Sequence, residues 1–326
     1  MPSKKVVQEK IKELSEKYSS TGQDLHSYLE GLLYADYLSY WDYIHLDTLL
    51  TLQTPKTDFP DENIFIIYHQ ITELYFKLCL AEIEQINKNG KNILDTGEDL
   101  GWHKELSVDL FIQKLERINR YIKNLIHSFD IMVDGMEKSQ FLKFRMALLP
   151  SSGFQSIQYR MLEIRSTDLN ELSNTTTQTP CSVEAGMETL YWKLGANELK
   201  SGKKSYTLMQ FEKKYQERLI KLAKKMESKN IWQKYMELKD GDRKNKKLIS
   251  LMKEYDLNVN VHWKLSHYRS AVKYLKKAHK ELAATGGTNW QKYLPPKFQK
   301  IIFFPKLLTK KEKENWGINW VLENYK

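Results

Sequence analysis

Apolar residues recur at the spacing of an α-helix through most of this chain, and few segments alternate in the manner of a strand. The clearest stretch runs from Phe65 to Lys77. One face of it carries aromatic residues and a histidine at a four, three, four spacing, namely Phe65, His69, Thr72 and Phe76. Glu73 and Lys77 are expected to form a supporting ion pair. The pattern predicts an all-α protein, a helical bundle with a small peripheral helical subdomain.

Glycine and proline residues divide this pattern into segments. Helices are expected at 4–18, from about 24, and at 62–89, 105–133, 136–148 and 155–166. The pattern indicates four parts: N-terminal helices (1–60), core helices (61–172), a polar linker with a Lys-rich peripheral subdomain (173–256), and a segment with another histidine-bearing helix (257–326). One stripe of that last helix contains Trp263, His267, Ala271, Tyr274 and Ala278. It leads into a Thr285-Gly286-Gly287 turn, where backbone amides can approach a ligand closely.

The composition is that of a globular chain, with 41% hydrophobic and 28% charged residues among 326. Cys79 and Cys181 cannot build a disulfide framework and lie in no metal-binding or haem-attachment motif, so a cytoplasmic location is expected. Neither a signal peptide nor a membrane span is expected. The net charge of +10 suggests nucleic-acid binding, but lysines are mixed with glutamates along helices, as at 211–218. Because that mixture is typical of solvated helix faces, no nucleic-acid partner is expected.

Two histidines, His69 and His267, lie on the apolar sides of separate helices. Such a pair can bracket a non-covalently held haem, with one imidazole on the iron and the other facing the bound gas or substrate. Spacing alone favours a simpler interpretation, in which each is a core histidine hydrogen-bonded to a neighbour. No nucleotide-binding, metalloprotease or serine-hydrolase motif is present to indicate another chemistry.

Arg145 stands between apolar residues, so its guanidinium needs a nearby acceptor. The simpler interpretation is a salt bridge to a structural carboxylate. The functional interpretation is a bidentate clamp on a substrate carboxylate, with Phe141 one turn earlier as an apolar wall. The turn at 285–287 is equally open to interpretation, because most turns of this composition only reverse the chain.

Several motifs nevertheless occur together in one order. They are Ser39-Tyr40-Trp41-Asp42-Tyr43-Ile44, Phe65-Ile66-Ile67-Tyr68-His69-Gln70, Phe144-Arg145, Pro150-Ser151-Ser152-Gly153-Phe154-Gln155, Trp263 four residues before His267, and Thr285-Gly286-Gly287. With this combination the chain resembles the tryptophan 2,3-dioxygenase family of haem enzymes over most of its length. Several motifs in order are more specific than any one of them, so the resemblance favours the functional interpretations of His69, Arg145 and His267.

The resemblance implies an all-α homotetramer with one haem b per subunit, active as Fe(II). It implies insertion of O2 across the indole C2–C3 bond of L-tryptophan to give N-formyl-L-kynurenine, the first step of tryptophan degradation by the kynurenine route. By matching positions, His267 would be the iron ligand, and Trp263, Ser151 and Ser152 would also bind the haem. His69 would be the catalytic residue on the distal side, near the indole N–H.

The resemblance also implies a set of tryptophan-binding residues. Phe65 and Phe141 would line the indole pocket, and Arg145 would pair with the substrate carboxylate. Thr285 would hydrogen-bond at the amino-acid end of the substrate. A segment of the N-terminal part would reach a neighbouring subunit's site through Tyr40, Tyr43 and Ile44.

Two departures from the family pattern stand out. Some members carry tyrosine at the position of Phe141, so a hydroxyl contact is absent there, although other members carry phenylalanine. The interval from His267 to Thr285 is about one helical turn longer than in compact bacterial members. The alternatives are a related haem enzyme acting on another aromatic amino acid or indole, and a non-catalytic haem-binding helical protein. The joint presence of His69, Arg145 and Thr285 disfavours the non-catalytic alternative.

Overall fold

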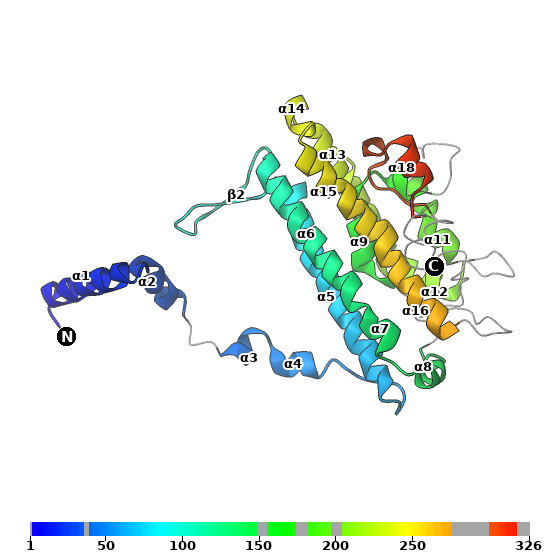
Figure 1. The fold of residues 1–326 in the computed structure, drawn as a ribbon, viewed down its shortest axis with the longest axis horizontal. Coiled ribbons are helices and arrows are strands. Elements are labelled where there is room, and N and C mark those ends of the chain that lie inside the picture. The colour runs from blue at the N-terminus through cyan, green and yellow to red at the C-terminus, as the bar shows by residue number, and fades with distance from the viewer. Residues whose placement is uncertain are drawn as a thin grey trace. The chain divides into compact units, whose positions relative to one another are not determined.

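The computed structural model describes residues 2–35, 39–148, 155–173, 182–196, 204–275 and 300–317 (Figure 1). The chain divides into two units, Met1–Thr54 and Pro55–Lys326, and each is described by itself. The all-α prediction is confirmed, because the described residues form helices joined by loops, with one small two-stranded ribbon. The division of the sequence into four parts remains a prediction.

The N-terminal unit consists of α1 (Lys4–Ser20), α2 (Leu25–Tyr34), α3 (Tyr40–Tyr43) and α4 (Leu46–Leu50). Asp24 caps α2, since its carboxylate accepts hydrogen bonds from the backbone amides of His26 and Ser27 at 3.1 and 3.0 Å. None of these four helices buries a residue, and apolar side chains such as Leu33 remain 82% exposed. The described part of this unit therefore has no hydrophobic core of its own.

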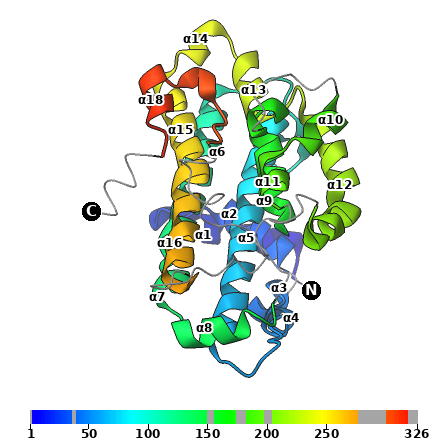
Figure 2. The ribbon, with the colours of Figure 1, turned by 90° about the vertical axis from the view of Figure 1, so that its right-hand side faces the viewer.

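Helix α5 (Asp61–Asn87) is the central element of the larger unit. It packs against α6 (Val108–Ser128) and α9 (Ile157–Ser166) (Figure 2). Its buried face consists of Tyr68, Thr72, Phe76, Cys79, Ile83 and Ile86. Of the four residues on the predicted face, Thr72 and Phe76 are buried, Phe65 is half-buried, and His69 is exposed rather than in the core. The predicted ion pair is wrong: Glu73 accepts a hydrogen bond from Gln158 Nε2 at 2.8 Å, which ties α5 to α9 instead.

Both ends of α5 are fixed by local contacts. At its start, the fully buried Glu62 accepts hydrogen bonds from the backbone amides of Lys56 and Thr57 at 2.7 and 2.8 Å. At its end, Gly90 has a φ of +87°, and a Cβ there would lie 2.3 Å from the Leu110 side chain. A ribbon follows, in which β1 (Lys91–Ile93) pairs with the antiparallel β2 (Asp99–Trp102). The ribbon projects from the helices (Figure 1) and was not expected from the sequence.

The predicted helix over 105–133 is two helices, α6 and α7 (Asp130–Asp134), with a break at Phe129. The predicted helix over 136–148 is shorter, since α8 covers Lys138–Phe144. The C-terminal half adds further helices: α10 (Val183–Glu188), α11 (Tyr191–Gly195), α12 (Tyr206–Met226), α13 (Ile231–Glu237), α14 (Asp240–Arg243), α15 (Lys246–Leu257), α16 (Trp263–Leu275) and α18 (Lys310–Glu314). Short 3-10 turns cover Leu169–Leu172 and Pro305–Leu307.

Helix α15 packs on α6, and α12 packs on α9 (Figure 2). A π-helical turn, Asn258–His262, joins α15 to α16 without a loop. Such turns are rare and frequently occur at functional sites. Here the turn sets the rotation at which α16 presents its side chains to α5 and α6.

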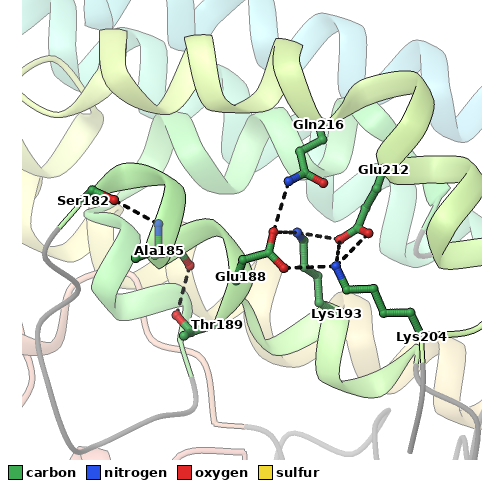
Figure 3. Close-up of polar contacts among 9 residues, drawn as sticks. Ser182, Ala185, Glu188, Thr189, Lys193, Lys204, Glu212 and Gln216 are labelled. Atoms are coloured by element: carbon green, nitrogen blue, oxygen red, sulfur yellow. Dashed lines mark hydrogen bonds and ion pairs between the residues drawn. The ribbon is translucent and has the colours of Figure 1, made fainter.

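Figure 3 shows a charged network that connects α10, α11 and α12. Lys193 Nζ lies 2.7 Å from a carboxylate oxygen of Glu212 and 3.0 Å from one of Glu188. Lys204 Nζ contacts the same two carboxylates at 2.9 and 3.1 Å. Gln216 donates a further hydrogen bond to Glu188 at 3.1 Å. Because the Lys193 side chain is only 4% exposed, this network fastens α11 onto the bundle.

Helix α5 is the one described helix that is long and apolar enough to cross a membrane on length and composition alone. A central helix of a bundle passes the same test, and α5 buries one face against α6 and α9. On its other face, Ile67, Leu74 and Leu78 are 43%, 50% and 46% exposed. These three residues, hereafter the α5 stripe, repeat at helical spacing and form one outward row. An exposed apolar row is typical of an interaction surface.

Candidate functional site

The two predicted histidines have the same hydrogen-bonding arrangement on different helices. His69 Nδ1 lies 2.7 Å from the carbonyl oxygen of Phe65, one turn earlier on α5. His267 Nδ1 lies 3.0 Å from the carbonyl oxygen of Trp263, one turn earlier on α16. A carbonyl can only accept a hydrogen bond, so Nδ1 carries the proton in both rings. Each imidazole therefore presents the lone pair of Nε2 to the site.

Burial lowers the pKa of both imidazoles, so both are neutral at neutral pH. For His267 burial lowers the pKa to about 4, the bond to Trp263 opposes this, and charge on His69 lowers it further. The ring of Phe129 lies 5.6 Å from that of Tyr68, the neighbour of His69 on α5, and 4.6 Å from that of His267 on α16. The structure thus brings together the parts of α5 and α16 that carry the two histidines.

Aromatic side chains from three helices surround the histidines. The Phe65 ring lies 4.1 Å from the His69 ring, centroid to centroid, and 6.4 Å from that of Phe141 on α8. The Trp263 ring meets the His267 ring edge to face at 4.3 Å. Phe141 is buried and lies 4.7 Å from Tyr274 on α16. These contacts join α5, α8 and α16 around apolar side chains, and the substrate and haem roles expected for Phe65, Phe141 and Trp263 stay predictions.

Arg145 follows the last turn of α8 and is buried, with 6% of its surface exposed. Its backbone amide donates to the carbonyl oxygen of Phe141 at 3.0 Å, which extends the helix by one residue. Burial lowers the pKa of the guanidinium, because the charged form loses hydration. The preceding residue, Phe144, contacts Phe65 at 5.8 Å. Arg145 is therefore attached to the same wall of the site as the aromatic pair Phe65 and Phe141.

The structure does not place some of the predicted site residues beside the two histidines. Tyr40 and Tyr43 belong to α3 and Ile44 follows it, all in the N-terminal unit, and the two tyrosines are 70% and 73% exposed. Ser151, Ser152 and Thr285 lie outside the described residues. Their roles stay as predictions from the resemblance.

Phe129 is a site residue that the sequence did not single out. It occupies the break between α6 and α7, and its ring lies 4.6 Å from His267 and 5.3 Å from Trp263. Phe129 has no local signal beyond its apolar character, since its position depends on where two distant helices meet. Phe144, named in the sequence only as part of the motif with Arg145, packs edge to face with Phe141 at 5.5 Å.

These residues fit a haem held between α5 and α16. A neutral imidazole whose Nδ1–H is bonded to the protein and whose Nε2 is available is the usual form of a metal-ligating histidine. A proximal histidine is the commonest axial ligand of haem iron in oxygen-binding proteins, and flat aromatic walls suit a flat macrocycle. His69 itself lies at the surface of α5, beside the ring of Phe65.

The fold and site define an all-helical protein with a two-histidine, aromatic-walled centre. The model of the tryptophan 2,3-dioxygenase family matches residues 31–285, which is most of the chain. The chain therefore belongs to the tryptophan 2,3-dioxygenase family, and the resemblance seen in its motifs is confirmed.

Individual relatives match a shorter stretch. The chain is 39% identical over 130 residues to a tryptophan 2,3-dioxygenase of Ruegeria sp. (strain TM1040), which covers 40% of this chain and 42% of the relative. It is 34% identical over 130 residues to a protein of that name from Pseudomonas fluorescens, covering 40% and 41%. A third from Polaromonas naphthalenivorans (strain CJ2) is 36% identical over 126 residues, covering 39% and 40%. The matched stretch thus spans about two fifths of these curated relatives.

Proposed function

We propose that this protein is a haem-dependent dioxygenase that inserts both atoms of O2 across the indole C2–C3 bond of L-tryptophan, giving N-formyl-L-kynurenine. The proposal rests chiefly on one observation, the pair of neutral imidazoles from α5 and α16 that both present Nε2 to an aromatic-walled site. Family membership supports the substrate class and the reaction.

His267 would hold the haem iron through Nε2. The backbone carbonyl of Trp263 would orient the imidazole by accepting its Nδ1–H, and the Trp263 ring would pack against it edge to face. When bound, haem b in its Fe(II) form supplies the oxygen activation. The remaining work of the protein is to bind and orient tryptophan and to exclude water. Ser151 and Ser152 would add polar contacts to the haem, as the family motif implies.

Substrate binding divides between an apolar and a charged part. Phe65 and Phe141 would bury the indole ring, and Arg145 would pair with the carboxylate through a bidentate contact. Thr285 would bond at the amino-acid end. Because a buried guanidinium is poorly hydrated, pairing with a carboxylate gains more there than at the surface.

His69 would accept a hydrogen bond from the indole N–H through Nε2. Its Nδ1–H is already bonded to Phe65, so only Nε2 can serve, and the ring orientation is set by the helix. An indole N–H is a weak acid, so orientation rather than full proton removal suffices as its role. The same contact would distinguish indole from an aromatic ring without N–H.

We further propose a cytoplasmic homotetramer, in which Tyr40, Tyr43 and Ile44 reach a neighbouring subunit's site. Two features of the chain support an oligomer. The described N-terminal helices bury none of their apolar residues, and the α5 stripe is exposed. Both are apolar surfaces that a second copy of the chain can cover.

Product analysis tests the reaction. Reduced, haem-loaded protein is given L-tryptophan and 18O2, and the products are identified by mass spectrometry. The proposal predicts N-formylkynurenine carrying two 18O atoms, with His267→Ala as the inactive control. A hydroxylated tryptophan with a single 18O and an intact indole ring would contradict it, and would favour a related haem enzyme of different outcome.

A further inference from the structure

A buried group of charged side chains lies on the side of α16 that faces α9 and α11. Its central member, Lys264, comes three residues before His267 and is 8% exposed. Its Nζ makes no hydrogen bond to any described residue. The ammonium instead lies over the Tyr191 ring, 4.5 Å from the centroid. Burying an ammonium without a hydrogen bond costs free energy that the contact with an aromatic ring offsets only in part, so a function of the Lys264 charge would explain why it is there.

The carboxylates around Lys264 are engaged with other groups. On α9, Glu163 pairs with Arg160 at 2.9 Å and accepts the hydroxyl of Tyr191. At the end of α15, Asp256 accepts hydrogen bonds from Asn260 Nδ2 at 2.8 Å and from the backbone amide of Phe304 at 2.9 Å. Lys264 therefore contributes its charge to the group without closing a hydrogen-bond network.

The charge of Lys264 is nevertheless largely kept at neutral pH. Burial lowers the pKa of Lys264 to about 8, Glu163 and Asp256 oppose this, and Arg160 adds to it. These three groups, with the Tyr191 ring, are the charged and titratable neighbours of the ammonium on α9, α11 and α15. Two cations and two carboxylates balance one another, so loss of Lys264 would leave one negative charge in excess.

Lys264 is close to the iron ligand of the proposed function. Three residues of α-helix rise by about 4.5 Å, so the two side chains leave neighbouring turns of α16. The bond from His267 Nδ1 goes to the carbonyl of the peptide that joins Trp263 to Lys264. At an effective dielectric constant of about 20, one buried charge on a neighbouring helical turn changes a one-electron equilibrium by on the order of tenfold.

We propose that the Lys264 ammonium favours the ferrous over the ferric state of the haem at this site, by placing a buried positive charge one turn from His267. This inference rests on the proposed function, because it requires haem on His267. The equilibrium concerned is the one-electron reduction of ferric to ferrous haem. The electron comes from an external reductant, which in the test below is the electrode. In this role Lys264 would act through its electric field and would not be a ligand of the iron.

The test is a spectroelectrochemical titration of haem-loaded protein, read from the Soret band of the ferric and ferrous forms. Lys264→Met removes the charge and keeps the length of the side chain, whereas Lys264→Arg keeps the charge. Lys273→Met is the matched control, because Lys273 is an exposed cation on the same helix whose charge is screened by solvent. At a fixed applied potential, Lys264→Met should lower the ferrous-to-ferric ratio by about tenfold. Lys264→Arg and Lys273→Met should stay within about twofold of the parent.

A Lys264→Met protein that keeps its haem and titrates like the parent would overturn the inference while leaving the proposed function intact. A parent protein that takes up no haem would instead count against the proposed function. If the methionine variant loses haem, the same titration is made with Lys264→Gln, and an unchanged ferrous-to-ferric ratio in that variant would likewise overturn the inference. Loss of haem from both neutral variants, but not from Lys264→Arg, would assign the charge to haem retention and contradict a role in the redox equilibrium.

Discussion

At the scale of the residue, the site depends on two backbone carbonyls as much as on two imidazoles. The carbonyls of Phe65 and Trp263 fix the protonated nitrogen of His69 and His267, and thereby the direction of each Nε2. The helical spacing of four residues that allows these bonds is visible in the sequence. The contact between the two helices is not visible there, because it depends on how α5 and α16 pack, with Phe76 5.9 Å from Trp263.

Arg145 gives the first residue-scale prediction. Arg145→Ala should raise the KM for L-tryptophan by about 10- to 100-fold, since a charge-assisted bidentate pair is lost from a buried site. The Soret band should stay near that of the parent, because the role proposed for Arg145 is to bind the substrate carboxylate and not the haem. Lys143→Ala is the matched control, as Lys143 is an exposed cation on the same helix. An unchanged KM, or loss of the Soret band, would argue against the carboxylate role.

Asp256 gives a pH-dependent prediction. Burial raises the pKa of its carboxyl from 3.8 to about 6, although bonds from Asn260 and Phe304 oppose this. A raised pKa means that the folded state holds the proton more tightly, so this contribution to stability is present below pH 3.8 and is lost as pH rises through about 6. Its size is about 2–3 kcal/mol. Asp256→Asn should therefore gain stability relative to the parent between pH 4 and pH 7, measured by thermal unfolding.

The control for this pH effect is Asp134→Asn, because the exposed Asp134 pairs with Lys273 and has a lowered pKa. It should not gain stability relative to the parent over the same range. If Asp256→Asn and the parent lost or gained stability in parallel from pH 4 to pH 7, Asp256 would not be the buried acid described here.

At the scale of the element, the existence of helices was predictable and their breaks were not. The apolar period identified α5 and the helical segments at α9 and α16, although α9 and α16 also bury consecutive residues on more than one face. The break at Phe129 was missed, since the sequence from α6 into α7 stays apolar and contains no proline or glycine there. The ribbon after α5 was missed because its strands are too short to show a period of two residues.

The charged network of Figure 3 gives the element-scale prediction. Lys193→Ala should destabilise the protein by about 3 kcal/mol, because it leaves the little-exposed carboxylate of Glu212 with one cation fewer. Lys221→Ala, which breaks an exposed pair with Glu217 on α12, should cost less than about 0.5 kcal/mol. Denaturant unfolding of the two variants measures the difference. Equal costs would mean that burial of Lys193 contributes nothing to the attachment of α11.

At the scale of the whole molecule, the chain carries more apolar surface than the described residues bury. The N-terminal helices have no core, and the α5 stripe is exposed on the central helix of the bundle. No sequence pattern separates such a surface from a core face, because both show the same helical period. The oligomer proposed above accounts for both surfaces.

The α5 stripe provides the whole-molecule prediction. A double substitution, Ile67→Glu with Leu74→Glu, should shift the protein to smaller species in light scattering coupled to size-exclusion chromatography, because it places charges in an apolar contact. Met209→Glu is the control, as Met209 is an exposed apolar residue on α12 outside the stripe. If the double variant kept the mass of the parent, the stripe would not be a contact between subunits.

The most direct test of the central claim, a haem held on His267 with His69 opposite, is a haem titration followed at the Soret band. The parent and a His69→Ala variant should each bind one haem per chain, since His69 is not the ligand. A His267→Ala variant should bind at least about tenfold more weakly and show a displaced Soret band, because the axial nitrogen is lost. Full haem occupancy of His267→Ala with an unchanged Soret band would contradict the account.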